Sequence, residues 1–155
     1  MDKNNVKISV KDFGSIEIEL YPNSAPITVA NFKKLVASNY YDGSIFHRII
    51  KGFMIQGGSG ITSLDPIYGE LASNGFKNEL KHERGVISMA RTMVKDSATS
   101  QFFIMHQDSP HLDGEYAAFG KVTKGIEVVD LIANVKTGYA DEPITKIIIE
   151  KVEFI

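Results

Sequence analysis

An arginine and a glutamine stand within a mainly apolar run at residues 45–57, where they could offer hydrogen-bond donors beside an apolar surface. Residues 45–50 alternate in the way of a β-strand, and a second strand can begin at 53–56 after a glycine. Arg48 and Gln56 would then be displayed beside phenylalanine and methionine, a composition typical of a site that binds something apolar in a fixed orientation. The same run also fits an ordinary strand pair, in which Arg48 is solvated and the apolar residues belong to the core.

Two later stretches, residues 88–104 and 110–120, favour the functional interpretation, because all three together resemble the signature of a known family. The first run, Phe46-His47-Arg48-Ile49-Ile50-x-Gly52-Phe53-Met54-x-Gln56-Gly57-Gly58, is similar to that of the cyclophilin family of peptidyl-prolyl cis-trans isomerases. Four later segments resemble the later motifs of the family in the same order: Ser88-Met89-Ala90, Ser100-Gln101-Phe102-Phe103-Ile104, Leu112-Asp113-Gly114 and Phe119-Gly120. The similarity runs over nearly the whole chain, which therefore resembles a microbial-like member consisting of one domain, residues 1–155.

The resemblance implies a role for each of a set of side chains. Those expected in catalysis are Arg48, Phe53 and Gln56, and those expected to bind substrate are Met54, Ala90, Arg91, Gln101, Phe103, His111, Leu112 and Tyr116. The guanidinium of Arg48 would donate a hydrogen bond to the prolyl nitrogen of a twisted Xaa-Pro bond, while Gln56 would hold the substrate backbone and help to position Arg48. The ring of the proline would sit against Phe53, Met54, Phe103 and Leu112, and the residues before it against Ala90, Arg91 and Gln101. Without the resemblance, Phe53, Met54 and Phe103 also fit plain core positions.

Some positions depart from the best-known members of that family. His111 stands where many cyclophilins have tryptophan beside the pocket, and Tyr116 stands where they have histidine at its rim. The segment 90–93 is also a variant, and the loop from it to Gln101 is one residue longer. These changes leave the expected isomerase residues in place. They predict a weakened affinity for a cyclosporin-type ligand, because the indole that would pack against it is missing.

The composition limits the function classes. The chain has 155 residues, 43% hydrophobic and 23% charged, which is ordinary for one globular domain. A net charge of -2 gives no general attraction to nucleic acid or anionic lipid, and no apolar run is long enough to cross a membrane. The polar start at residues 1–5 leads into a strand pattern without a signal-peptide core, so a cytoplasmic location and a monomer are expected. The absence of cysteine excludes disulfides, thiol nucleophiles and thiolate metal ligands.

The hydrophobic periodicity predicts the elements that would position these residues. Alternation predicts a hairpin over 6–20, strands at 85–90, 101–105 and 117–122, and a last strand over 144–155 whose phase changes near Glu150-Lys151. Helical spacing predicts a helix from the Ser24-Ala25-Pro26 start to Ser38-Asn39, and a second over 125–135. Glycine, serine, aspartate, proline and asparagine dominate residues 57–78, which indicates a long loop.

These elements are not a βαβ series, and they favour a mainly β, antiparallel barrel or sandwich. The resemblance implies the first of these, a closed eight-stranded antiparallel β-barrel capped by two α-helices, with its site on the outer face. The expected function is a cofactor-free isomerase acting on proline-containing peptides and unfolded or flexible proteins. A non-catalytic module that binds proline-containing segments is the main alternative, and a small-molecule carrier using the barrel interior is a third.

Other chemistries find little support in the residues. The glycine-rich run 57–60 lacks the lysine and the following helix of a phosphate-binding loop. His106 and His111 are five residues apart without a carboxylate at zinc-protease spacing, so no metal is expected. No Gly-x-Ser-x-Gly motif frames a nucleophilic serine. His47 neighbours Arg48 but should point to the opposite face of the strand, where a structural role is expected.

Overall fold

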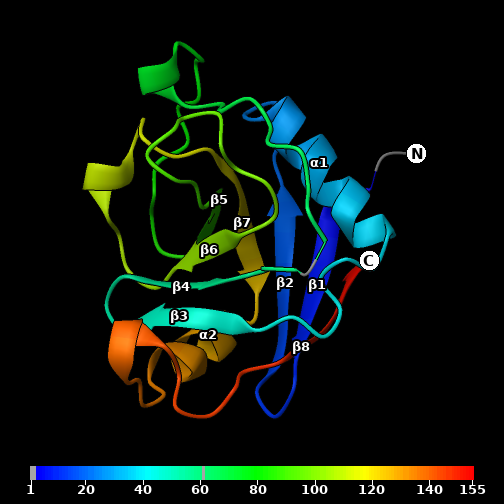
Figure 1. The fold of residues 1–155 in the computed structure, drawn as a ribbon, viewed down its shortest axis with the longest axis vertical. Helices are drawn as coiled ribbons and strands as arrows, with labels where there is room; N and C mark the ends of the chain where they lie inside the picture. Colours follow the sequence, from blue (N-terminus) through cyan, green and yellow to red (C-terminus); the bar gives the residue numbers. More distant parts are fainter. Residues whose placement is uncertain (1–2, 61) are drawn as a thin grey trace.

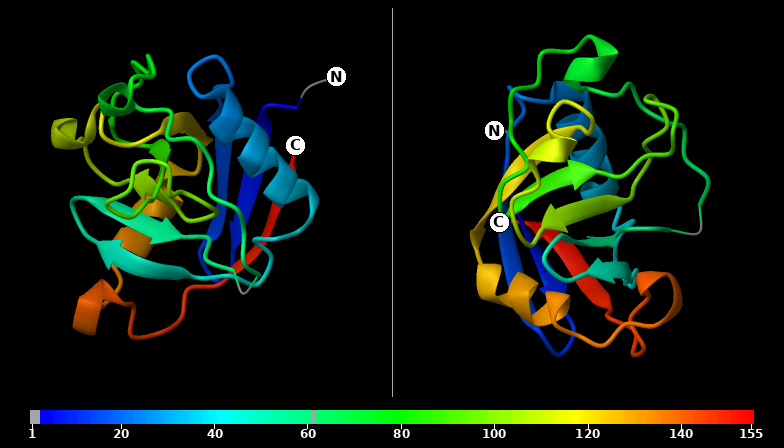
Figure 2. Two further views of the ribbon diagram at one scale, coloured as in Figure 1. Left: turned by 45° about the horizontal axis from the view of Figure 1, so that its top comes forward. Right: turned by 90° about the vertical axis from the view of Figure 1, so that its left-hand side faces the viewer.

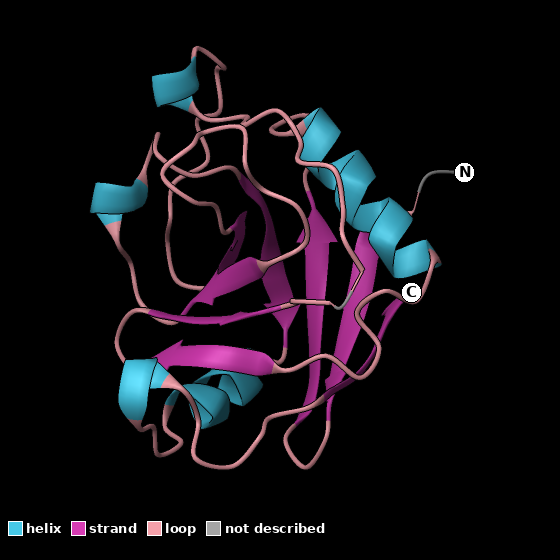
Figure 3. Ribbon diagram, viewed as in Figure 1, coloured by secondary structure: helices cyan, strands magenta, loops and turns pink. Residues whose placement is uncertain are grey.

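Within residues 3–60 and 62–155, the part of the chain that is described, eight antiparallel β-strands form one curled sheet in the computed structural model (Figures 1 and 3). The strands are β1 (Asn5–Val10), β2 (Gly14–Leu20), β3 (Phe46–Ile50), β4 (Met54–Gly57), β5 (Val86–Met89), β6 (Phe102–Met105), β7 (Ala118–Lys124) and β8 (Ile149–Phe154). Their order across the sheet is β3-β4-β6-β5-β7-β2-β1-β8. The predicted mainly β, antiparallel class is confirmed.

The two edge strands, β3 and β8, meet at a narrow seam that closes the sheet into a barrel. An antiparallel bridge joins Ile45 to Ile148, and the amide of Phe46 donates a hydrogen bond to the carbonyl oxygen of Ile147 at 3.0 Å. Beyond this bridge the strands diverge, since β3 runs nearly across the direction of β1 and β2 (Figure 1). The seam pairs part of both edges and so reduces the backbone left open to other chains.

Apolar side chains fill the interior of the barrel between α1 (Pro26–Ala37) and α2 (Ile126–Ala133), which lie at its opposite ends (Figure 2). Phe32 of α1 inserts its ring among those of Tyr41, Phe102 and Phe119, with ring centroids 5.2 to 5.8 Å from its own. All four rings are fully buried. Because the interior is packed, a binding site must lie on the outer surface.

The start of α1 is capped by a residue far away in the sequence. Pro26 suits the first turn because its missing amide hydrogen would have no helical partner there. The next two amides, of Ile27 and Thr28, donate to the carboxylate of Glu70 at 3.1 and 2.6 Å, and the Thr28 hydroxyl donates to it at 2.7 Å. Glu70 is fully buried and comes from the long segment before β5. The predicted long loop therefore contributes a structural anchor.

The predicted elements agree with the structure except at a few ends. The last strand is shorter than the predicted 144–155 and begins at Ile149. Before it, the amide of Ile144 donates to the carbonyl oxygen of Lys136, and Ile147 and Ile148 make the seam contacts with residues 45 and 46. The predicted change of phase is confirmed, since Ser9 pairs with Lys151 and Val10 with Ile149, which leaves one extra residue in β8. Met1, Asp2 and Ile61 lie outside the described residues, so the predictions for residues 1–5 and 57–78 are described only in part.

Candidate active site

The site residues expected from the sequence gather around one pocket on the outside of the barrel. Its volume is about 380 Å³, and its lining residues are Arg48, Phe53, Met54, Gln56, Ala90, Arg91, Phe103, His111, Leu112 and Tyr116. Gln101 lines an adjoining pocket of about 210 Å³ that shares Gln56, Ala90 and Arg91 with the first. A larger cavity of about 640 Å³ lies between the β1–β2 turn and residues 144–148, but it has no lining residue in common with this pocket and contains neither Arg48 nor Gln56.

The apolar wall of the pocket belongs to a second hydrophobic cluster, separate from the barrel core. Met54, Phe103 and Leu112 are all less than 10% exposed, and they pack with Val86 and Met105. Met54 pairs with Met105 across β4 and β6, which places this cluster on the outer face of the strands. The plain-core interpretation of Phe53, Met54 and Phe103 is therefore right only for the burial of Met54 and Phe103, which also line the pocket, whereas Phe53 is half-buried.

A row of polar side chains crosses the pocket along its strands. Arg48 on β3 pairs directly with Gln56 on β4, and its Nη1 donates to Gln56 Oε1 at 3.5 Å. Gln56 Nε2 in turn donates to Gln101 Oε1 at 3.1 Å. The long contact from Arg48 leaves most of the donors of its exposed guanidinium free for another acceptor. His47, one residue before Arg48, is half-buried, and burial and the charge of Arg48 lower its pKa.

The rim of the pocket is braced by Arg91. Its guanidinium carbon lies 4.8 Å from the ring centre of Tyr116, and its Nε and Nη2 donate to the carbonyl oxygen of Glu115 at 3.0 and 2.7 Å. A guanidinium that stacks on an aromatic ring and satisfies its donors in this way holds the two segments of the rim together. On the opposite side the ring of His111 lies 5.8 Å from that of Phe53 and is tilted by 31°.

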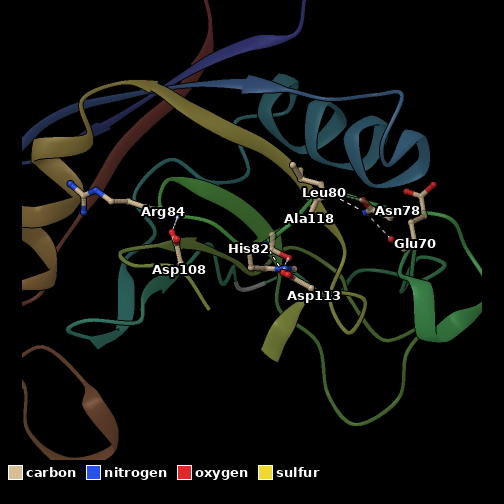
Figure 4. Close-up of polar contacts among 9 residues, drawn as sticks. Glu70, Asn78, Leu80, His82, Arg84, Asp108, Asp113 and Ala118 are labelled. Carbon is tan, nitrogen blue, oxygen red and sulfur yellow. Dashed lines mark hydrogen bonds and ion pairs between the residues drawn. The ribbon is translucent and has the colours of Figure 1, made fainter. Parts of the chain in front are cut away.

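A hydrogen-bonded chain of Ser88, His82 and Asp113 packs against the wall at Phe103, and Figure 4 shows its contact between His82 and Asp113. His82 Nε2 lies 2.9 Å from the Ser88 hydroxyl, and His82 Nδ1 lies 3.2 Å from Asp113 Oδ1. The His82 ring stacks on Phe103 with centroids 6.0 Å apart, and burial lowers its pKa. Serine, histidine and aspartate occur here in the order of a hydrolase triad, but Ser88 is fully buried and no substrate can reach it. The chain therefore holds Phe103 and the turn at Asp113.

Sequence reasoning left His82 as one histidine among four without a specific role. The only signal was its position six residues before Ser88, and neither periodicity nor spacing shows that the two side chains meet. Among the described residues, no cluster of three histidine, cysteine, aspartate or glutamate side chains is arranged to hold a metal ion. In the same part of the chain, no helix has the length and apolar character needed to span a membrane.

A packed antiparallel barrel that carries an arginine-edged apolar pocket on its outer face is the architecture of a cyclophilin-like protein. The family model for cyclophilin type peptidyl-prolyl cis-trans isomerase/CLD matches residues 5–154, and the chain belongs to this family. Similar proteins are named peptidyl-prolyl cis-trans isomerases, so the chain belongs to a family of isomerases.

Proteins similar in sequence include isomerases of two bacteria. The peptidyl-prolyl cis-trans isomerase of Acinetobacter baylyi is 50% identical over 145 residues, which is 86% of this chain and 74% of that protein. Peptidyl-prolyl cis-trans isomerase B of Bacillus subtilis is 46% identical over 127 residues, with 81% of this chain and 87% of that one covered.

Solved structures show the same fold. A crystal structure of a cyclophilin type isomerase from Cryptosporidium parvum has a TM-score of 0.89 and 34% identity, and the match covers 99% of this chain and 98% of that one. A second structure of that protein was determined in the presence of the dipeptide Ala-Pro, and it matches with a TM-score of 0.86, 34% identity and coverage of 97% and 98%. The predicted barrel with its two helices is confirmed.

Proposed function

We propose that the protein accelerates rotation about Xaa-Pro bonds in peptides and in folding or flexible proteins, with Arg48 donating a hydrogen bond to the prolyl nitrogen of the twisted bond. The observation that carries the proposal is the position of Arg48, beside Gln56, at the edge of a pocket of about 380 Å³ whose wall includes Phe53, Met54, Phe103 and Leu112. The Ala-Pro dipeptide with which the similar parasite protein was crystallised supports the same class of ligand.

The chemistry requires a donor that acts late in the rotation. Peptide-bond resonance sets a barrier of about 18–20 kcal/mol, and the uncatalysed Xaa-Pro rotation takes tens to hundreds of seconds. At the midpoint the resonance is broken, so the nitrogen regains a lone pair that can accept a hydrogen bond. A donor that reaches this lone pair only in the twisted state lowers the barrier, whereas contacts made equally in both states do not.

Arg48 cannot supply the whole effect. An acceleration of about five decades requires roughly 7 kcal/mol, at about 1.36 kcal/mol for each decade. One hydrogen bond from a charged group contributes about 1.5–3 kcal/mol. The rest must come from desolvation of the imide and from fixing the residues on either side of the proline.

The other residues take roles that follow from their places. Gln56 would hold both the substrate backbone and Arg48, and Gln101 would extend this polar row toward the residues before the proline, next to Ala90 and Arg91. His111 and Tyr116 would form the rim, where the missing indole weakens a cyclosporin-type ligand. A monomeric, cytoplasmic protein of one domain, acting without cofactor, remains a prediction from the sequence.

The test is the cis-trans relaxation of an Ala-Pro peptide with the intact protein and with Arg48→Ala. We expect kcat/KM to fall roughly ten- to hundredfold in the variant, with kcat carrying most of the loss. Lys51→Ala is the matched control, because Lys51 is an exposed cation close to Arg48 but outside the pocket. An intact protein that binds the peptide without accelerating its relaxation would favour the non-catalytic module, and an active Arg48→Ala protein would remove Arg48 from the mechanism.

A further inference from the structure

Phe53 belongs to a loop and not to a strand, although it lines the proposed proline pocket. Ile50 of β3 pairs with Met54 of β4, so residues 51–53 form the connection between the two strands. The amide of Phe53 donates to the carbonyl oxygen of Ile50 at 3.0 Å, and Gly52 has a φ of 80°, which favours glycine. The sheet ladder does not extend to Phe53, and beyond this one bond its position depends on contacts from outside the hairpin.

His106, the residue directly after β6, makes those contacts. The amide of Gly52 donates to His106 Nδ1 at 2.8 Å, and the amide of His106 donates to the carbonyl oxygen of Phe53 at 2.9 Å. The side chain and the backbone of one residue therefore hold both ends of the two-residue segment Gly52–Phe53. His106 lies three residues after Phe103 on the same segment, so the position of one pocket wall is tied to that of another.

The second ring nitrogen of His106 fixes the orientation of the ring. Because Nδ1 accepts from an amide, it carries no proton in this arrangement, and Nε2 is the protonated nitrogen. Nε2 lies 3.1 Å from Asp130 Oδ1 on α2 and donates to it. The side chain of His106 is 9% exposed, so a different orientation would leave buried nitrogen atoms without partners.

Asp130 is itself held by Arg84 in a two-pronged contact. Arg84 Nη1 and Nη2 each donate to one oxygen of Asp130 at 2.7 Å, and Nη1 also donates to the carbonyl oxygen of His106 at 2.9 Å. The amide of Arg84 donates to Asp108 at 2.7 Å, which anchors the segment before β5 (Figure 4). The guanidinium of Arg84 lowers the pKa of Asp130 through these hydrogen bonds. A carboxylate with two charge-assisted bonds is a firm support for the His106 ring.

We propose that His106 is a positioning residue for Phe53, and that Asp130 and Arg84 act through it. None of the three lines the pocket, so they affect the reaction only by holding the Gly52–Phe53 unit where the proline ring meets it. The proposal rests on the proposed isomerase function for its kinetic consequence, but the structural part is independent of that function. Phe53 touches the ring in the bound and in the twisted state alike, so its displacement should raise KM and leave kcat nearly unchanged.

Two substitutions separate the two ends of the His106 ring. In His106→Asn the side-chain oxygen can take the place of Nδ1 and accept from the amide of Gly52, but it cannot reach Asp130. In His106→Gln the side-chain amide can take the place of Nε2 and donate to Asp130, but no acceptor faces Gly52. Glu79→Gln is the control, because it removes an exposed ion pair with Lys77 that has no connection to the pocket.

The measurements are KM and kcat for an Ala-Pro peptide, the hydrogen-exchange protection of the Gly52 amide by NMR, and the thermal unfolding midpoint. For His106→Gln we expect loss of Gly52 protection and a KM raised about fivefold, as the loss of one hydrogen bond implies. His106→Asn keeps an acceptor for the Gly52 amide but loses the support of Asp130, so we expect its Gly52 protection and its KM to lie between those of the unchanged protein and those of His106→Gln. For Glu79→Gln we expect both to stay within about twofold of those of the unchanged protein.

The proposal is overturned if His106→Gln keeps both Gly52 protection and KM, or if both His106 variants lose activity only in proportion to their loss of thermal stability. If the intact protein does not accelerate relaxation, the proposed function fails, while the Gly52 protection and the Phe53 ring signals of the variants still decide whether His106 holds the loop.

Discussion

Replacing Glu70 by alanine should destabilise the protein strongly and leave its chemistry unchanged. Glu70 is fully buried and accepts the amides of Ile27 and Thr28 and the Thr28 hydroxyl. It lines no part of the proline pocket. The carboxylate thus serves as the N-terminal cap of α1, a task that Ala25 at the helix boundary has no side chain to perform.

The magnitude follows from the groups left without partners. Each of the two amides loses its acceptor at a cost of about 1–3 kcal/mol, and the negative charge at the helix start contributes about 0.3–1 kcal/mol more. Partial entry of water into the space left by the side chain reduces these costs, so we expect a loss of about 3–5 kcal/mol in the free energy of unfolding. Glu70→Gln keeps one acceptor oxygen but brings an NH2 group toward the same amides, and a loss of about 2–3 kcal/mol is expected.

Urea denaturation followed by circular dichroism measures these losses, and the peptide relaxation assay measures activity below the unfolding transition. Glu79→Ala is the matched control, because that carboxylate is exposed, and its loss should cost less than about 1 kcal/mol. A loss below about 1 kcal/mol in Glu70→Ala would refute the capping argument. A large loss of activity in protein that is still fully folded would refute the separation of this anchor from the pocket.

Three further predictions concern histidines and the pocket wall. Burial lowers the pKa of His47 and His82, so as the pH is lowered these histidines take up protons in the unfolded chain before they do so in the folded protein. The free energy of unfolding should therefore decrease as the pH is lowered below about 6.5. Urea denaturation at several pH values checks this, and a free energy that does not change with pH would contradict it. His111→Trp should tighten binding of a cyclosporin-type ligand, which an inhibition titration measures, and unchanged inhibition would count against the role of the missing indole. Met54→Ala should cost about 2–5 kcal/mol of stability and also raise KM, and a change in stability alone would make Met54 a core residue only.

Periodicity predicted the elements whose burial is decided locally. In α1 the predicted apolar face, Val29, Phe32, Leu35 and Val36, is the buried face, because helical spacing by itself brings these side chains together. The extra residue near Glu150 was visible as a change of phase for the same reason. The late start of the last strand was not visible, since residues 144–148 have strand-like composition, whereas in the structure they contact Lys136 and the segment before β3.

The pocket residues were predicted from motifs, and the structure brings them together, but their anchors were not predicted. Glu70 meets Thr28 across 42 residues, and His106 meets Gly52 across 54. Pairs this distant leave no pattern in a single sequence, because a buried polar residue is recognised only by the partner that satisfies it. His82, His106 and Glu70 were therefore indistinguishable from surface residues until the fold was known.

One half of the pocket wall is held by strands, and the other half lies in loops that side-chain hydrogen bonds hold. Met54 and Phe103 lie on strands and are positioned by the ladder, whereas Phe53 and Leu112 lie in a hairpin connection and a single 3₁₀ turn. Such segments open more readily than strands unless side-chain hydrogen bonds hold them. His106 bonds the first of these segments, and the ring of His82, whose Nδ1 lies 3.2 Å from Asp113 Oδ1, holds the end of the second. Substitutions at these two histidines should therefore loosen the loop-borne half of the pocket, while the strand-borne half stays in place.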